Sequence, residues 1–120
     1  MANPFVYVQL QTQDLDKAKA FYGKLFDWKY DEKTTAFGPY VEIGVGQGTA
    51  GGMVGQRDSN TPSRWVPYVV VDDIDVTASQ ARALGGTIVQ APIALPNKSK
   101  FGLVMDPTGA LFALHQAPPK

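Results

Sequence analysis

The chain has 120 residues, which suits one compact domain with a buried core, and 44% of its residues are hydrophobic. Eleven basic residues balance eleven acidic ones, so the charge does not favour a binder of nucleic acid or of an anionic membrane surface. The absence of cysteine excludes disulfides and thiolate metal sites, and without a signal peptide or a long apolar run we expect a cytoplasmic protein that does not span a membrane.

Residues 5–11 alternate between two kinds of side chain, which predicts a strand. One face is aliphatic, and we expect it to pack under a helix: Val6, Val8 and Leu10. The other face carries polar and aromatic groups: Tyr7, Gln9 and Gln11. These three side chains should point toward a cavity or toward solvent.

An amphipathic helix follows the first strand, with Asp14 as its N-cap and Asp16 in its first turn. Apolar side chains recur there at helical spacing: Leu15, Ala18, Tyr22, Leu25 and Phe26. Strands are predicted over 28–34, 40–45 and 50–55, and the glycines of the last one indicate a close approach of two backbones. The polar segment 56–63 is the best candidate for a linker.

The second half repeats this order. A strand over 65–71 leads to a helix capped by Asp73, and strands over 87–90, 101–105 and 111–115 follow, with a loop over 91–100. The two capping residues are 59 apart (73 − 14 = 59), and the same offset takes Leu25 to Leu84. We therefore predict an α+β fold of two tandem βαβββ modules in a single domain, with module 1 at 1–57, a linker at 58–61 and module 2 at 62–120.

Several motifs in this repeat resemble those of a known family. In the first half these are Asp14-Leu15-Asp16-Lys17-Ala18, Phe21-Tyr22 and Leu25-Phe26-Asp27-Trp28. In the second half they are Val70-Val71-Asp72-Asp73-Ile74-Asp75, Leu84-Gly85-Gly86 and Asp106-Pro107-Thr108-Gly109. They resemble the two modules of the glyoxalase/bleomycin resistance protein/extradiol dioxygenase superfamily, also called vicinal oxygen chelate (VOC) proteins. The resemblance covers essentially the whole chain and implies an open, cupped, eight-stranded sheet around a ligand cavity between the modules, and a homodimer.

The resemblance also implies where a metal ion would be held in active members. The positions are Tyr7, its equivalent Val66 in the second half, Ala113, and a residue of the glycine-rich strand near Gly52 and Met53. Apart from the Tyr7 phenol, these residues offer no oxygen or nitrogen side-chain ligand. We therefore predict no metal site and no cofactor.

Three residues are candidates for acid/base chemistry. His115 is the only histidine, and alternation turns it toward the same face as Ala113. Tyr7 stands at a position where the resemblance implies a metal ligand, and Glu42 lies on an alternating strand that points either inward or outward. Each has a plainer interpretation, as a surface or sheet-edge residue, and the catalytic residues stay unknown at this point.

The ligand-binding candidates are Tyr7, Gln9, Met53, Tyr68 and His115. Polar groups on the first strand would orient a small molecule, while Tyr68 and Met53 would supply aromatic and apolar contact. The plainer interpretation is a solvent-exposed sheet face for Tyr7 and Gln9 and core packing for the aromatic residues. Arg64, Lys98 and Lys100 flank loops and are candidates for an anionic ligand, although isolated basic side chains in loops are usually solvated.

Two functions of different class follow from these residues. The first is a metal-free protein that binds a small organic molecule, like the resistance members of the family. The alternative is a lyase or isomerase of the glyoxalase type with a non-standard or metal-independent site that uses His115 or Tyr7. The sequence does not identify the ligand, and it leaves open whether Glu42 and His115 face the cavity.

Overall fold

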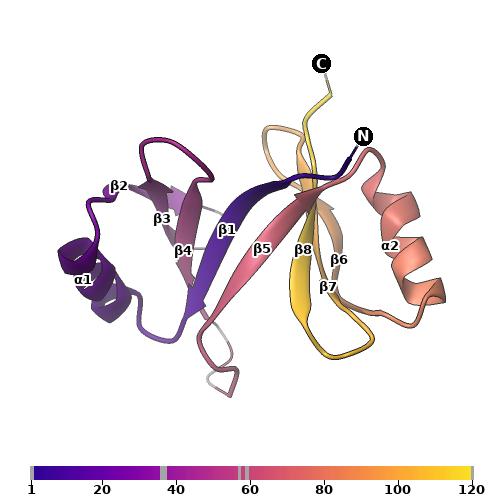
Figure 1. Ribbon diagram of the computed structural model, residues 1–120, viewed down its shortest axis with the longest axis horizontal. Coiled ribbons are helices and arrows are strands. Elements are labelled where there is room, and N and C mark those ends of the chain that lie inside the picture. The colour runs from indigo at the N-terminus through magenta and orange to yellow at the C-terminus, as the bar shows by residue number, and fades with distance from the viewer. Residues whose placement is uncertain (1, 36–37, 57, 59, 120) are drawn as a thin grey trace. The chain divides into compact units, whose positions relative to one another are not determined.

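The computed structural model describes residues 2–35, 38–56, 58 and 60–119 and holds two helices and eight strands in them (Figure 1). Contacts divide the chain into two compact units. We call Tyr7–Val66 the N-terminal unit, and Pro67–Lys120 together with Met1–Val6 the C-terminal unit. The predicted end of module 1, at residue 57, lies outside the described residues, and the single-domain arrangement stays a prediction.

The N-terminal unit is a four-stranded mixed sheet with one helix. Its elements are β1 (Phe5–Thr12), α1 (Leu15–Leu25), β2 (Lys29–Thr35), β3 (Gly38–Gly44) and β4 (Gly51–Gly55), and the first two residues of β1 belong to the C-terminal unit. The strand order is β2-β3-β4-β1, with β1 parallel to β4 and the other neighbours antiparallel. This register sets Gln9 beside Gly52 and Leu10 beside Met53.

Alternation decides what each face of this sheet carries. Leu10, Val41, Ile43 and Met53 are buried on one face. Partly buried side chains of α1, of β2 and of the segments after α1 and β3 pack against them: Leu15, Ala18, Tyr22, Trp28, Tyr30 and Val45. The predicted packing of the aliphatic face under a helix is thus confirmed at Leu10. Removal of this apolar surface from water is the main force that holds α1 on the sheet.

The C-terminal unit repeats the same plan. Its elements are β5 (Arg64–Val70), α2 (Ile74–Ala83), β6 (Thr87–Ala94), β7 (Lys100–Met105) and β8 (Leu111–Gln116), of which β5 begins in the N-terminal unit. The strand order is β5-β8-β7-β6, with β5 parallel to β8 and the others antiparallel. The offset of 59 residues takes the start of β1 to the start of β5 and the start of α1 to the start of α2. The predicted α+β fold with two βαβββ modules is therefore confirmed.

The largest difference from the sequence prediction concerns β6. We expected a strand over 87–90 and a loop over 91–100, but the strand continues to Ala94. Its pairing with β7 is interrupted by register shifts between Ile88 and Gln90 and between Gln90 and Ile93. Pro92 lies in the second irregular stretch, because a proline lacks the N–H of a regular ladder and is tolerated at a bulge or on an edge strand.

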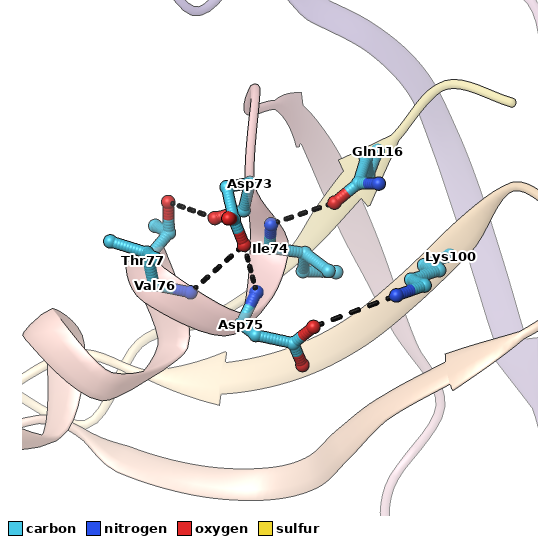
Figure 2. Close-up of polar contacts among 7 residues, drawn as sticks. All are labelled: Asp73, Ile74, Asp75, Val76, Thr77, Lys100 and Gln116. Carbon is cyan, nitrogen blue, oxygen red and sulfur yellow. Dashed lines mark hydrogen bonds and ion pairs between the residues drawn. The ribbon is translucent and has the colours of Figure 1, made fainter. Parts of the chain in front are cut away.

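The core of the C-terminal unit lies between its sheet and α2. Val71, Ile74, Ala78, Val104 and Leu114 are its buried members. Figure 2 shows how α2 begins: the Asp73 carboxylate accepts hydrogen bonds from the backbone N–H groups of Asp75 and Val76, at 3.1 and 3.2 Å. The Gln116 side chain of β8 accepts another from the N–H of Ile74 at 2.9 Å. Three N–H groups that the helix itself leaves unpaired are satisfied in this way. Neither described helix is long and apolar enough to cross a membrane.

We predict that Asp73→Ala lowers the free energy of unfolding by about 1 kcal/mol, because two N–H groups of α2 lose their acceptor. Asp72→Ala is the matched control, since Asp72 is exposed and precedes the cap. It should change stability by less than about 0.5 kcal/mol. Urea denaturation of both variants measures the difference, and equal losses would contradict the assignment of the cap.

Candidate functional site

A chain of hydrogen bonds crosses the face of the N-terminal sheet that is turned away from the Leu10 core. The Tyr7 and Tyr40 hydroxyl oxygens are 2.5 Å apart, and the Gln9 side-chain amide donates to the Tyr40 hydroxyl at 3.3 Å. Gln11 Nε2 donates to the side-chain oxygen Oε1 of Gln9 at 3.1 Å, and Arg64 Nε donates to the side-chain oxygen Oε1 of Gln11 at 2.9 Å. We call these five residues the polar row. It confirms that Tyr7, Gln9 and Gln11 share one face of β1.

A glycine makes room for the aromatic end of this row. Gly52 of β4 is buried beside Gln9, and a Cβ atom built there would lie 2.2 Å from both the Tyr7 and the Tyr40 hydroxyl oxygens. The two phenols therefore meet directly above a backbone without a side chain. The glycines of this strand predicted a close approach, but Tyr40 was not among the predicted site residues. Its alternation with Val41 and Ile43 in β3 was the signal that placed it on the polar face.

The environment of Tyr40 keeps its phenol protonated. Burial raises the pKa of Tyr40 above its usual value, and the hydrogen bonds from Gln9 and Tyr7 oppose this only in part. At neutral pH the Tyr40 phenol is therefore uncharged and can both donate and accept a hydrogen bond.

A pocket of about 410 Å³ in the N-terminal unit brings two of the predicted candidates together. Tyr7 and Glu42 line it, with Asp31 and Lys29 among their neighbours. The Glu42 side chain is 49% exposed, and its carboxylate lies 3.0 Å from Lys33 Nζ. Glu42 is thus a solvent-exposed, ion-paired group in this unit, and its catalytic role stays a prediction.

The sequence-based placement of Met53 needs correction. Met53 was expected to line the same surface as Tyr7 and Gln9, but its side chain is fully buried in the core with Leu10 and Val41. The parallel register explains the difference: Met53 pairs with Leu10 and Gly52 pairs with Gln9, so alternation turns Met53 toward α1.

The remaining candidates, Tyr68 and His115, belong to the C-terminal unit. Tyr68 is buried and pairs with Ala113 across β5 and β8, and His115 follows two residues later on the same face of β8. Leu114 points the other way, into the α2 core. Tyr68 and His115 therefore share a face of their own sheet, while the prediction that they line one pocket with Tyr7 and Gln9 stays a prediction.

Partial burial sets the protonation state of His115. Desolvation lowers the pKa of this imidazole below its ordinary value of 6.5, because the charged form is poorly hydrated there. The neutral form, which can accept a proton, therefore dominates at neutral pH.

The residues at the positions expected for metal ligands do not fit a divalent ion. Val66 and Ala113 are both fully buried and have no donor atom in their side chains. The Tyr7 hydroxyl is hydrogen-bonded to Tyr40. Within the part of the chain that the structure describes, no three His, Asp or Glu side chains gather as a group that could hold a metal ion.

Comparison with known proteins identifies the family. The sequence profile of the Glyoxalase/Bleomycin resistance protein/Dioxygenase superfamily matches residues 5–114. The chain belongs to this superfamily. It is also 30% identical over 116 residues to "Putative glyoxylase CFP32" of Mycobacterium bovis and to the protein of the same name of Mycobacterium tuberculosis. These matches cover 96% of this chain but only 44% of either relative, so the chain spans less than half the length of these superfamily members.

Solved structures of low sequence identity share the fold of this superfamily member. A hypothetical protein from Bacillus halodurans C-125 matches with a TM-score of 0.70 at 10% identity, over 100% of this chain and 98% of the other. Methylmalonyl-CoA epimerase from Mycobacterium tuberculosis matches with a TM-score of 0.67 at 16% identity, over 96% of this chain and 88% of the other. At these identities the likeness establishes the fold and does not transfer an activity.

We predict that Gly52→Ala separates the two phenols and lowers the free energy of unfolding by about 1–3 kcal/mol, because the new methyl group occupies their meeting point. Gly55→Ala in the same strand is the control, since a Cβ atom there would meet nothing within 4 Å. Urea denaturation compares the two variants. A Gly52→Ala protein as stable as Gly55→Ala would contradict the close approach above β4.

We predict that stability falls as the pH drops from about 7.5 to 5.5, and that His115→Gln reduces this fall. The pKa of His115 is lower in the folded chain than its unfolded value of 6.5, so the unfolded state binds the proton more readily over this range. Thermal unfolding in a pH series measures the effect. An unchanged pH slope in His115→Gln would show that the imidazole is as well solvated in the folded protein as in the unfolded chain.

Proposed function

We propose that this protein binds a small organic molecule on the polar row of the N-terminal unit, without a metal ion. The observation that carries the proposal is the continuous set of hydrogen bonds from Tyr7 and Tyr40 through Gln9 to Gln11 and Arg64. Donors and acceptors of this kind fix the orientation of a ligand in a binding site, while aromatic surface supplies much of the contact.

The row is suited to binding because its members hold one another in place. Each side chain is hydrogen-bonded to the next, so little rotational freedom remains to be lost when a ligand arrives. Carbonyl, hydroxyl or amide groups on a ligand match these donors and acceptors. The apolar residues at the expected metal-ligand positions, Val66 and Ala113, support a mode of binding that needs no metal.

The second candidate function is a lyase or isomerase of the glyoxalase type that works without a metal. The specific support is the 2.5 Å contact between the Tyr7 and Tyr40 hydroxyls. Tyr7 would donate its proton to a substrate oxygen, and the Tyr40 hydroxyl would then stabilise the Tyr7 phenolate with its own hydrogen bond. His115, neutral at pH 7, is the other candidate for the acid/base residue.

The test is binding to protein freed of metal with EDTA. A library of small aromatic and carbonyl compounds is screened by NMR, with the side-chain amide signals of Gln9 and Gln11 as reporters. We expect compounds that shift these signals and whose affinity drops about tenfold in Tyr40→Phe, the effect of one lost hydrogen bond. Tyr30→Phe is the control, since the Tyr30 hydroxyl donates to the Lys19 carbonyl on the face that carries the core.

Two outcomes would contradict the proposal. Compounds that bind only after a divalent metal is restored would overturn the metal-free mode, and equal losses in Tyr40→Phe and Tyr30→Phe would remove the polar row from the binding site.

The enzymatic alternative is tested with methylglyoxal and glutathione as substrates. Turnover that persists in EDTA and is lost in Tyr7→Phe would favour it over simple binding.

Family resemblance also supports a homodimer. Size-exclusion chromatography with light scattering tests this part of the proposal directly.

A further inference from the structure

We propose that Arg64 and Gln56, at one end of the polar row, form a subsite for the carboxylate of an organic acid. The inference rests on the proposed function, because it names the class of ligand that the same row would take. It is carried by a guanidinium with no carboxylate partner and a side-chain amide nitrogen with no acceptor among the described residues.

Arg64 is a half-buried cation without a counter-ion in the described part of the chain. Its Nε donates to the neutral Gln11 side chain, and no described carboxylate lies within 4.0 Å of its guanidinium. Some basic residues do have such a partner: Lys33 lies 3.0 Å from Glu42, and Lys100 lies 3.5 Å from Asp75 (Figure 2). A partly desolvated guanidinium gains most from an anion that replaces the lost water.

Gln56 supplies the second unmatched donor. Its side-chain nitrogen is buried and has no hydrogen-bond partner among the described residues. The backbone N–H of Gln56 donates to the Thr12 carbonyl at 2.6 Å, which continues the parallel pairing of β1 and β4 beyond Gly55. Alternation along β4 then places Gln56 on the face of Gly52 and Val54, which is the face of the polar row. A buried donor left unpaired normally marks the place of a missing acceptor.

The chemistry of the two groups selects a carboxylate. Both offer N–H donors, and the guanidinium adds a positive charge and a planar fork that matches two carboxylate oxygens. The side-chain oxygen of Gln11 accepts the hydrogen bond from Arg64 Nε. The two terminal nitrogens of the guanidinium are therefore left for a ligand. Tyr7 and Gln11 are about 13 Å apart along the strand, so an acid bound at Arg64 would extend its body toward Gln9 and Tyr40.

Benzoate and benzamide test the subsite, because they share size and ring but differ in charge. We titrate each into ¹⁵N-labelled protein and follow the Arg64 Nε–H and Gln56 side-chain signals by NMR. Benzoate should shift both signals saturably, and benzamide should bind about tenfold more weakly or not at all, since a hydrogen bond to a charged group is the stronger kind. Arg64→Gln and Gln56→Met should each weaken benzoate, and Arg64→Lys should retain part of its affinity.

Arg82→Gln is the matched control, since Arg82 is an exposed residue in the last turn of α2 and the variant removes the same charge. It should bind benzoate as the parent chain does. Equal binding of benzoate and benzamide, an equal loss in Arg82→Gln, or benzoate shifts that avoid Arg64 and Gln56 would overturn the carboxylate subsite. So would the absence of saturable benzoate binding to the folded parent protein.

The outcomes also separate this inference from the proposed function. Neutral compounds that depend on Tyr40 while benzoate fails to bind would leave the proposed function standing and remove only the subsite. Benzoate bound at Arg64 with no effect of Tyr40→Phe on any compound would keep the subsite and remove the rest of the row.

Discussion

The pleat of β1 is the constraint on which the functional part of this protein depends. Successive side chains of a strand point to opposite faces, so Leu10 cannot enter the core without turning Gln9 and Gln11 away from it. Burial of Leu10 with Val41 and Ile43 beneath α1 therefore fixes the position of the polar side chains as well. A slip of one residue in register would turn the glutamines into the apolar core beneath α1 and the leucine out of it, which the hydrophobic effect opposes strongly.

Polar groups held close together on a partly buried face are stabilising only when they are satisfied. The row meets this condition, from the phenol pair to the Arg64–Gln11 hydrogen bond, and the glycine at position 52 provides the space that the phenols need. The condition fails beyond the row at Gln56, whose buried side-chain nitrogen has no partner among the described residues. The place where the network is incomplete is also the place where it carries charge, and this coincidence is the physical basis for expecting an acidic ligand there.

The two halves of the chain use one fold for different surfaces. The offset of 59 residues relates Tyr7, Gln9 and Gln11 of β1 to Val66, Tyr68 and Val70 of β5. The hydrogen-bonding row of the first half thus corresponds to two valines and one tyrosine in the second. Both halves share the backbone plan and an aspartate cap on the helix, the features that each module needs to fold. The chemistry of the non-core face was free to differ between the modules.

Local patterns in the sequence determined much of the architecture. The caps at Asp14 and Asp73, the period-two strands and the 59-residue repeat all act between neighbours in the chain, and they predicted the two βαβββ modules and the shared face of Tyr7, Gln9 and Gln11. Only the tertiary structure decided that Tyr40 meets Tyr7, that Met53 enters the core and that Arg64 reaches Gln11. These facts depend on which strands are neighbours and on their register. Both are set by contacts between residues far apart in the chain, which no local pattern encodes.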